Sequence, residues 1–587
     1  MRKTKIICTL GPACDNEEIM KKLVLSGMDV ARTNFSHGSH QEHKKRIELL
    51  KKVAADVGRP IALLLDTKGP EIRTGRLKGD QVLLKAGQSF ILTAQDIEGN
   101  DLSVSITYKE LFRDVQKGSH ILIDDGLIEL KVQDIYESDI HCIVLNGGRL
   151  GNNKGINVPG ADIHLPSITQ QDIEDIQFGI ENDYDFIAAS FVRKADDVAE
   201  IKRVLEKNGG QEIKVISKIE NRQGIQNIDE IIMISDGIMV ARGDLGVEIP
   251  VEEVPIVQKM LIEKCYRNGK PVITATQMLD SMIRNPRPTR AEASDVANAI
   301  YDGTSCIMLS GETASGKYPV ETLETMSRIA EKAETAMDYR KRFVGAQFEM
   351  MPTITNAISH ATCTTAMDLK ASAIITVTKS GHTARMISRF RPDCPIIATT
   401  VSPKVQRQLS LSWGVLPYLV QEATSTDEMF EMGVEKALES GLVKNGDLTV
   451  ITAGIPVGVS GTTNILKVHL VGRVLVNGTG IGKGVVTGEL CVGRTYEEVI
   501  GRFSEGNILV VPFTTNDMMP LIKKASAIIV EESGVNSHAA TVGMALDKPV
   551  ITGAQNALSI LKSGSVVTVD ADRGIVHYEK VVPPHKD

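Results

Sequence analysis

One lysine and two carboxylates stand at the ends of two consecutive apolar runs. The run at 213–219 carries Lys218, and Glu220 comes two residues later, so both side chains share one face of an extended strand. Asp244 follows the next run, at 237–241, in the stretch Arg-Gly-Asp. Two carboxylates suit a divalent metal that bridges a phosphate, and an ammonium group can balance the remaining negative charge of the phosphoryl group. The alternative for Lys218 and Glu220 is a structural ion pair that closes one end of a barrel.

Polar side chains also follow other apolar runs. Arg32 lies in the last part of the run at 28–34 and Arg73 in the polar stretch after the run at 61–66, and guanidinium groups hold phosphates in a bidentate fashion. Oxygen-bearing side chains that could form a cage for a monovalent cation are Asn34, Ser36, Asp66 and Thr67. Thr276 follows a later run and offers a small hydroxyl that could orient a water or a substrate carboxylate. A core threonine whose hydroxyl bonds the backbone is the alternative for Thr276.

Short apolar runs alternate with helical patterns over the first part of the chain. The runs that we interpret as strands lie at 5–10, 28–34, 61–66, 185–190, 213–219, 237–241, 271–275 and 305–309. Amphipathic helices follow most of them, for example at 16–26 after an Asp15 N-cap and at 252–268 after Pro250. These eight units predict an α/β fold built on a (β/α)₈ TIM barrel, with its chemistry at the carboxyl ends of the strands.

Other segments interrupt or follow the barrel pattern. Between the third and fourth strands, apolar and polar positions alternate between Gly and Asp turns, which predicts a small β-barrel lid domain on the catalytic face. A later segment alternates helices and strands again and predicts a separate α/β domain. The expected domains are the catalytic barrel (1–69 and 166–345), the lid (70–165), an α/β allosteric domain (346–473) and an extra C-terminal domain (474–587).

Composition narrows the class of protein. The 587 residues carry a formal net charge of −8, which argues against nucleic acid as a partner. No apolar run reaches the roughly 20 residues that a membrane span needs. The basic start of the chain is cut short by Gly11 and Pro12, so we interpret it as a first strand rather than a signal peptide. The eight cysteines form no Cys-X-X-Cys pair, which favours reduced thiols in a cytoplasmic protein. The short apolar runs also argue against a membrane partner.

Several stretches resemble the motifs of pyruvate kinases, and their order along residues 1–473 fits this family as well. They are ICTLGP (7–12), ARTNFSHG (31–38), LDTKGPEIRTG (65–75), SKIEN (217–221), MVARGDLGVEIP (239–250), ATQMLDSM (275–282) and MLSGETA (308–314). The resemblance implies transfer of the phosphoryl group of phosphoenolpyruvate to ADP, which gives pyruvate and ATP in the last step of glycolysis. It also implies Mg²⁺ or Mn²⁺ and K⁺ as cofactors, and a homotetramer.

The resemblance also implies roles for individual residues. Lys218 would stabilise the phosphoryl group in flight, Arg32 would contact the phosphoryl group of phosphoenolpyruvate, and Thr276 would lie near the face where the enolate is protonated. Glu220 and Asp244 would ligate Mg²⁺ or Mn²⁺. The residues expected to line the substrate are Arg32, Gly243, Asp244 and Thr276. The expected K⁺ ligands are Asn34, Ser36, Asp66 and the Thr67 carbonyl. The residues expected to meet the nucleotide are Asn34, Phe35, Ser36, His37, Arg73 and, from the lid, Lys154.

Glu71 predicts a requirement for K⁺. Family members that do not depend on K⁺ resemble one another in having lysine at this position, whereas this chain has glutamate. A lysine would supply a tethered positive charge, and without it the site needs a free cation.

A second candidate site lies in the α/β segment, where a predicted strand meets a predicted helix. The loop consists of Thr378, Lys379, Ser380, Gly381, His382 and Thr383. Hydroxyls, glycine and backbone amides at a helix N-terminus form a phosphate cradle, and an ordinary N-capped turn is the alternative. The similar loop of pyruvate kinases binds a phosphorylated allosteric effector. The opposing stretch 456–464 has no basic residue for a second phosphate, which favours a monophosphate such as AMP or ribose 5-phosphate.

The last segment resembles the phosphohistidine, or swivelling, domain of phosphoenolpyruvate-utilising enzymes. The matching stretches are 534–540 and 548–553, in which His538 aligns with the phosphate-accepting histidine. Ser533 and Asn536 replace the usual Gly and Thr, so we expect a packing or regulatory role rather than phosphate transfer. The glycine-rich stretch at 477–488 lacks the spacing of a phosphate-binding loop, and we interpret it as strands and turns.

Two other classes of function are the alternatives. A phosphocarrier or regulatory protein would act through His538 and carry a degenerate barrel, but every expected barrel motif is intact. A metal-dependent lyase or aldolase would use Lys218 as a Schiff-base amine. Such a lysine should be desolvated among apolar groups and needs no paired metal ligands, and borohydride trapping with pyruvate distinguishes this class.

Overall fold

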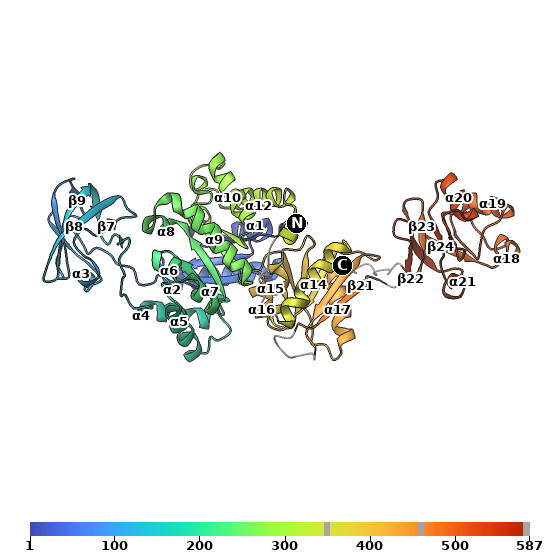
Figure 1. Cartoon of the computed structure of the whole chain (residues 1–587), viewed down its shortest axis with the longest axis horizontal. Helices are drawn as coiled ribbons and strands as arrows, with labels where there is room; N and C mark the ends of the chain where they lie inside the picture. The colour runs from blue at the N-terminus through green and yellow to red at the C-terminus, as the bar shows by residue number, and fades with distance from the viewer. Residues whose placement is uncertain (346–352, 456–462, 473, 579–587) are drawn as a thin grey trace. The chain divides into compact units, whose positions relative to one another are not determined.

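The computed structural model describes residues 1–345, 353–455, 463–472 and 474–578 (Figure 1). The chain forms two compact units. One consists of Met1–Asn356 with Thr378–Gln421, and the other of Ala357–Val377 with Glu422–Asp587. Within the described ranges, no helix has the length and apolar character that crossing a lipid bilayer requires.

Eight parallel strands close into a barrel in the first unit, which confirms the predicted (β/α)₈ fold. They are β1 (Lys5–Thr9), β2 (Val30–Asn34), β3 (Ala62–Asp66), β12 (Phe186–Ala189), β13 (Lys214–Ile219), β14 (Gly237–Ala241), β15 (Val272–Ala275) and β16 (Cys306–Leu309). Each strand lies within a residue or two of its predicted run. The apolar runs located the strands because barrel strands are buried on both faces.

Helices follow the barrel strands. The helices of ten or more residues are α1 (Glu17–Ser26), α2 (His40–Val57), α4 (Gln170–Glu181), α5 (Ala195–Lys207), α9 (Val254–Arg267), α10 (Arg290–Asp302) and α12 (Pro319–Thr335). Shorter helical segments are η1 (Pro12–Cys14), α6 (Arg222–Gln226), α7 (Ile228–Ile234), α8 (Arg242–Glu248), η2 (Val251–Glu253), η3 (Asp280–Ile283), α11 (Gly311–Ala314) and α13 (Tyr339–Gly345). The predicted N-cap of α1 was wrong by one residue, because the Asn16 side chain accepts the capping hydrogen bonds. Asp15 instead pairs with Arg46 at 2.6 Å.

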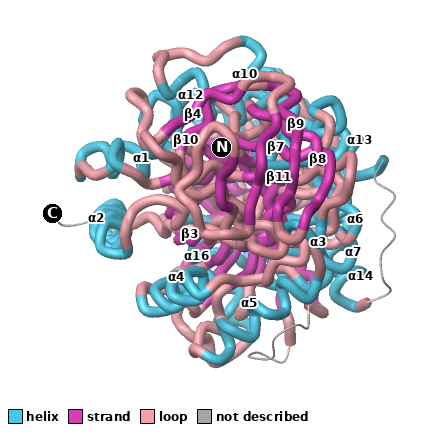
Figure 2. The backbone as a smooth tube through the Cα atoms, turned by 90° about the vertical axis from the view of Figure 1, so that its left-hand side faces the viewer, coloured by secondary structure: helices cyan, strands magenta, loops and turns pink. Residues whose placement is uncertain are grey.

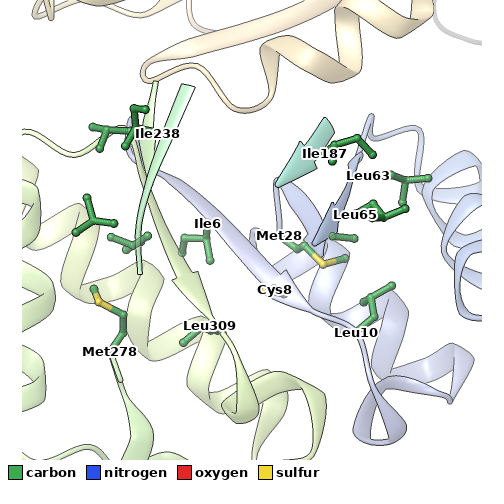
Figure 3. Packing of buried hydrophobic residues seen from close by; sticks show 14 of the residues in the cluster. Ile6, Cys8, Leu10, Met28, Leu63, Leu65, Ile187, Ile238, Met278 and Leu309 are labelled. Atoms are coloured by element: carbon green, nitrogen blue, oxygen red, sulfur yellow. The ribbon is translucent and has the colours of Figure 1, made fainter. Parts of the chain in front are cut away.

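Side chains alternate between two apolar layers along the barrel strands. On β1, Ile6 and Cys8 pack outward in the layer beneath the helices, whereas Ile7 belongs to the cluster inside the barrel. On β3, Leu63 and Leu65 likewise pack outward beneath the helices, whereas Leu64 belongs to the cluster inside the barrel. Figure 3 shows Ile6, Cys8, Leu63 and Leu65 among the side chains of the outer layer. This double packing fixes the register of the strands, and so it fixes the position of each residue that ends a strand.

The segment between β3 and β12 forms the predicted β-rich insert, with its own buried core. Six of its strands form one sheet, in the order β11 (Ile156–Asn157), β7 (His120–Ile123), β8 (Ile128–Tyr136), β9 (Asp139–Asn146), β5 (Ser89–Thr93) and β6 (Ser103–Ser105). A second pair joins β10 (Gly148–Gly151) to β4 (Gln81–Leu84). Figure 2 shows β11, β7, β8 and β9 side by side. One helical turn, α3 (Leu111–Asp114), departs from the all-β expectation.

The α/β segment contributes to both compact units. In the first unit, β18 (Ile396–Thr400) pairs in parallel with β19 (Val415–Leu419), accompanied by α15 (His382–Arg389) and α16 (Pro403–Leu409). In the second unit, β17 (Ala373–Val377) pairs in parallel with β20 (Leu448–Ala453), which pairs antiparallel with β21 (Ile465–Leu470). The other helices of the segment are α14 (Ile354–Asp368) and α17 (Thr426–Glu439).

The rest of the second unit holds one eight-stranded sheet. Its order is β22 (Val474–Asn477), β29 (Ile575–Tyr578), β28 (Val566–Asp570), β24 (Val485–Val492), β25 (Ile508–Val511), β26 (Ala527–Val530), β27 (Val550–Thr552) and β23 (Thr479–Ile481). Its helices are α18 (Tyr496–Ile500), α19 (Met519–Lys524), α20 (His538–Ala545) and α21 (Ala557–Ile560). The glycine-rich stretch forms strands and a turn, as predicted, with Gly482 and Gly484 at positive φ between β23 and β24.

Candidate active site

Lys218 lies near the end of β13 among three oxygen-bearing side chains. Its Nζ is 2.9 Å from Glu220 Oε1 and 3.0 Å from Asp66 Oδ1, and it donates a hydrogen bond to Ser190 Oγ at 2.8 Å. Asp66 ends β3, and Ser190 follows β12. Adjacent strands therefore bring together groups that are far apart in sequence. The ion pair between Lys218 and Glu220 is present, but it belongs to a larger cluster.

The charges in this cluster determine which groups are ionised. Burial by itself lowers the pKa of Lys218, but Asp66 and Glu220 outweigh burial and hold that pKa well above its ordinary value. Burial raises the pKa of Glu220 to about 7, with Lys218 opposing the rise and Asp244 adding to it. Lys218, whose side chain is 12% exposed, is therefore a protonated cation. This state suits charge stabilisation and does not suit a Schiff-base nucleophile, which must be a neutral amine.

Ser190 is a member of the cluster that the sequence did not reveal. Its hydroxyl donates to the Thr67 carbonyl oxygen at 2.6 Å, and its own N–H donates to Thr67 Oγ1 at 3.2 Å. It holds the end of β12 to the segment after β3, and its Oγ also accepts a hydrogen bond from Lys218 Nζ. A single serine after an apolar run has no distinctive spacing, and only its position at a strand end could have identified it.

Arg32 is buried beside Asp66. Its Nε is 2.6 Å from Asp66 Oδ2, and its Nη1 donates to Thr9 Oγ1 at 2.9 Å. Burial by itself raises the pKa of Asp66, but Arg32 and Lys218 reverse this and lower it below its ordinary value. Asp66 is thus an ionised, fully buried carboxylate that fixes two cations, Arg32 on the neighbouring strand β2 and Lys218 on β13, across β12.

Asp244 lies in the first turn of α8, directly after β14. It lines a pocket together with Glu71, at the start of the insert after β3, and Glu248 from the same helix. Among the described residues, no group of three or more His, Cys, Asp or Glu side chains is arranged to hold a metal ion. Asp244 and Glu220 act on one another electrostatically, and a divalent ion bound by both would take its other oxygen ligands from substrate or water.

The four predicted K⁺ ligands lie on adjacent strand ends. Asn34 and Asp66 are register partners at the ends of β2 and β3, and Phe35 N–H donates to the Asp66 carbonyl at 3.0 Å. Ser36 N–H donates to Asn34 Oδ1 at 3.2 Å. The Thr67 carbonyl accepts from Ser190, as described above. Asn34 and Asp66 therefore lie side by side, and K⁺ binding by the four residues stays a prediction. The sequence did not reveal that Asp66 also holds two cations.

Thr276 has a left-handed backbone, with φ of 68°. Its Oγ1 accepts from Gly243 N–H at 2.8 Å and donates to the Ala275 carbonyl at 2.6 Å. Arg242 Nη2 donates to the Thr276 carbonyl at 2.7 Å, and Arg242 Nη1 pairs with Asp295 at 2.8 Å. A non-glycine residue in this region is strained, and Arg242, the first residue of α8, supports this backbone conformation through its hydrogen bond to the Thr276 carbonyl. The sequence did not indicate this supporting role of Arg242.

Part of the predicted nucleotide set surrounds one cavity of about 610 Å³. Members of the predicted sites that line it are Arg32, Asn34, His37 and Thr276. Phe35 is directed elsewhere, because its ring stacks on that of His43 at 4.4 Å and is only 8% exposed. The Phe35 ring thus packs against His43, and only the backbone of Phe35 is available to contact a ligand.

Arg73 and Lys154 lie in the insert, where each is held by an acidic partner. Arg73 Nε donates to Glu71 Oε2 at 2.8 Å, and its Nη1 donates to the Asn153 carbonyl at 2.8 Å. Lys154 Nζ is 2.9 Å from Asp124 Oδ1. Neither lines the 610 Å³ cavity. Glu71, the residue that predicts a K⁺ requirement, is partly neutralised by Arg73.

Polar contacts join the insert to the barrel near Asp244. Asn157 Nδ2 donates to Glu248 Oε1 at 2.9 Å, and Gln223 Nε2 donates to Asp162 Oδ1 at 3.0 Å. Burial raises the pKa of Glu248, although the hydrogen bond from Asn157 acts in the opposite sense. The insert therefore contacts the helix that carries one of the two metal-ligating candidates.

The predicted effector loop lies between β17 and α15, and its backbone forms a tight entry to the helix. Gly381 is the N-cap of α15, with φ of 76°, and Thr378 N–H donates to the Thr399 carbonyl at 3.0 Å. Thr378 and Thr383 are buried. Burial lowers the pKa of His382, and nearby cations lower it further. The opposing stretch at 456–462 lies outside the described residues.

His538 is the first residue of α20, and both ring nitrogens have partners. Nδ1 lies 2.8 Å from Thr514 Oγ1, and Nε2 lies 3.0 Å from Asn516 Oδ1. Ser537 caps the helix by accepting from Ala540 N–H. The ring is therefore held in one orientation by the segment that follows β25.

Comparisons with known proteins agree with this geometry. Residues 1–323 match the model of the pyruvate kinase barrel domain, and residues 356–469 match that of the pyruvate kinase alpha/beta domain. The chain belongs to the pyruvate kinase family. It is therefore a phosphotransferase. Residues 503–574 also match the mobile domain of PEP-utilising enzymes, as the motif around His538 indicated.

Relatives from the family match nearly the whole chain. The pyruvate kinases of Sporosarcina psychrophila and Bacillus licheniformis are each 52% identical over 579 residues, which is 98% of this chain and 99% of theirs. A crystal structure of a pyruvate kinase from Cryptosporidium parvum has a TM-score of 0.77 and 42% identity, and covers 80% of this chain and 96% of its own. This similarity supports the barrel and the α/β segment as the shared architecture of the family.

Proposed function

We propose that this chain transfers the phosphoryl group of phosphoenolpyruvate to ADP and so forms pyruvate and ATP. The observation that carries the proposal is the buried cluster of Lys218, Asp66 and Glu220 beside Arg32. Its two cations, from β2 and β13, lie on either side of Asp66 at the carboxyl ends of the barrel strands, and Glu220 and Asp244 supply two carboxylates. Phosphoryl transfer requires mainly alignment and positive charge around the migrating group, and this cluster supplies both.

In the proposed site, Arg32 binds the phosphoryl group of phosphoenolpyruvate, and Lys218 stabilises the charge that develops during transfer. Glu220 and Asp244 would hold Mg²⁺ or Mn²⁺, since two carboxylates are suitable oxygen ligands for a hard divalent ion. The bound ion would neutralise charge on phosphate oxygens and on the enolate. Gly243 and Thr276 would line the substrate, with the Thr276 hydroxyl near the face where the enolate is protonated.

Asn34, Ser36, Asp66 and the Thr67 carbonyl are the proposed K⁺ ligands. Their fit rests on four neutral or anionic oxygens at the ends of two paired strands. Asp66 orients both Arg32 and Lys218, so a cation at this place would act through the same carboxylate that positions the catalytic cations. This coupling gives a physical reason for K⁺ dependence.

The nucleotide would enter from the side of the insert. The residues proposed to meet it are Asn34, Phe35, Ser36, His37, Arg73 and Lys154. The contact between Asn157 and Glu248 supports a lid that closes over the substrate and excludes water, which limits hydrolysis of the phosphoryl group.

The loop at 378–383 is proposed to bind a phosphorylated effector, such as AMP or a sugar monophosphate, in a homotetramer. Support comes from the capped entry to α15, where backbone N–H groups and the Gly381 turn favour an anion. The loop belongs to a segment remote in sequence from the catalytic motifs, so any effect on the rate would be allosteric.

A coupled assay with lactate dehydrogenase tests the proposed function. Pyruvate should form only when phosphoenolpyruvate, ADP and a divalent ion are all present, and K⁺ should be varied separately from Mg²⁺. Absence of pyruvate formation under every combination would disprove the proposal. Borohydride treatment with pyruvate should leave Lys218 unmodified, because its ammonium group is held protonated by two carboxylates.

A further inference from the structure

A second concentration of positive charge lies in the first unit at the opposite end of the barrel from the proposed active site. It borders a pocket between the segments that lead into β15 and β16 and helix α15. We call it the basic pocket, and its charged lining residues are Lys270, Arg385, Arg389 and Arg391. None of the described residues that line it is acidic. Trp413 forms part of its wall.

Arg391 is buried with part of its hydrogen-bonding capacity unused. Only 6% of the residue is exposed, and its Nη2 donates to the Gly303 carbonyl and to Ser305 Oγ, each at 3.0 Å. Its Nε and Nη1 are buried and make no hydrogen bond within the described part of the chain. Its guanidinium lies 4.6 Å from the centre of the Trp413 ring. A cation–π contact compensates only part of the cost of burying such a cation.

Arg385 and Lys270 are also short of anionic partners. Arg385 makes no hydrogen bond or ion pair with the described residues, and Lys270 Nζ donates to the Ser235 carbonyl at 2.6 Å. The acid that acts on both of them is Asp236. Asp236 is already 3.3 Å from Lys202 Nζ. Burial lowers the pKa of Lys270 and of Arg385, as expected where positive charge is incompletely balanced.

We propose that the basic pocket binds a phosphate group, with Arg385, Arg391 and Lys270 as its ligands. Guanidinium groups with free donors pair with phosphate oxygens, and a phosphate would balance the excess charge. In this partly open pocket, the space that the centre of a water-sized group can reach is about 20 Å³, which accommodates one phosphate oxygen. The ligand is therefore inorganic phosphate or the terminal phosphate of an ester whose remainder stays outside.

This site goes beyond the proposed function, and it is separate from the proposed effector loop. No residue of 378–383 lines the pocket. The two places adjoin, however, because a Cβ built at Gly381 would lie 2.7 Å from Arg385 Nη1. A phosphate in the basic pocket would join the barrel end to α15, two parts of the first unit that are distant in sequence.

Trp413 provides a readout at the pocket itself, because it is the single tryptophan of the chain. The full chain is titrated with sodium phosphate, and in parallel with sodium chloride at matched ionic strength, while tryptophan emission is recorded. We expect a saturable change with phosphate that chloride does not reproduce. A second arm uses glycerol 3-phosphate. Equal affinity would identify the phosphate group alone as the ligand, and tighter binding would identify an ester.

Variants locate the signal. Arg385→Gln and Lys270→Gln, at partly exposed positions, should each weaken phosphate binding by about tenfold or more, the loss expected for one charge-assisted contact. Arg203→Gln, the same change on exposed α5, should have no effect, and Lys218→Met should retain the emission change. The proposal is overturned if phosphate and chloride act alike, if Arg203→Gln weakens binding equally, or if Lys379→Glu abolishes the response while Arg385→Gln preserves it.

Discussion

Lys218 is the residue on which the proposed chemistry depends most directly, since its ammonium group is buried between Asp66 and Glu220 and is held protonated. Such a cation can stabilise charge that appears only during transfer. Lys218→Met should therefore lower kcat by about 100-fold or more and change the KM for phosphoenolpyruvate only modestly. Steady-state kinetics in the coupled assay measure both parameters.

Lys214→Met is the matched control, because Lys214 begins the same strand and lies 4.0 Å from Asp236. Its kcat should remain close to that of the wild type. If Lys218→Met retains more than about a tenth of the wild-type kcat, a loss below ~1.4 kcal/mol, Lys218 has no part in the mechanism.

Glu71 is the residue that sets the expected need for K⁺. The wild type should be slow in buffer free of Na⁺ and K⁺, and Glu71→Lys should relieve this dependence by supplying a tethered cation. The same assay with and without K⁺ measures the effect, and Glu98→Lys on the exposed surface of the insert serves as control. A wild type that runs at full rate without K⁺ would show that the proposed cation cage is wrong.

At the scale of elements, Asp29 ties the start of β1 to β2. Its carboxylate pairs with Arg2 at 2.7 Å and accepts from Ile6 N–H at 2.9 Å. Burial by itself raises the pKa of Asp29, but Arg2, Lys5 and Arg59 more than offset this and lower it. A lowered pKa adds stability above the pKa of the unfolded chain, about 3.9, and that stability is lost as the pH falls through the folded pKa.

Asp29→Asn should consequently lower the stability at pH 7 by about 1.5–3 kcal/mol, the range for hydrogen bonds to charged groups. The difference in the free energy of unfolding between this variant and the wild type should narrow as the pH falls below about 4. Thermal melting between pH 7 and pH 3 measures this, with Asp56→Asn on the exposed face of α2 as control. A gap that stays constant over this range would show that the Asp29 charge is not the cause.

The entry to α15 is the element on which the proposed activation depends. Lys379→Glu and Ser380→Asp should abolish activation by AMP or ribose 5-phosphate and leave the maximal rate nearly intact. In the wild type, the effector should lower the apparent KM for phosphoenolpyruvate, and phosphoenolpyruvate should tighten effector binding by the same factor. Lys370→Glu, an exposed change outside the loop, is the control. If saturating AMP, ribose 5-phosphate and fructose 1,6-bisphosphate all leave the saturation curve unmoved, the loop is a structural turn.

The elements could be predicted from the sequence because their signals are local. Each barrel strand is a short apolar run, and the polar residues that end these runs meet once the barrel closes. Contacts between strands were not predictable in the same way. Ser190 has no distinctive spacing, and the pairing of Asp66 with both Arg32 and Lys218 depends on how the closed barrel brings β2, β3 and β13 together. The cap of α1 was missed because Asp15 and Asn16 are equally good capping residues, and Arg46 from another helix decides between them.

At the scale of the whole molecule, the segment from 474 onward is the part that the proposed chemistry does not use. The match to the Cryptosporidium pyruvate kinase covers 96% of that chain but only 80% of this one, so this family includes a shorter chain. A chain truncated near residue 473 should therefore form pyruvate at a rate similar to that of the full chain. Changes are expected mainly in stability or effector response, and loss of catalysis in a truncated chain that still folds would contradict this.

The most direct test of the central claim follows the phosphoryl group itself. Direct transfer in the barrel predicts that label from ³²P-phosphoenolpyruvate passes to ATP, while the protein carries no acid-labile, base-stable label. His538→Ala should transfer label at the wild-type rate, because the histidine is not on the route. Label on His538 that chases into ATP at the turnover rate would contradict direct transfer and place the C-terminal segment in the reaction.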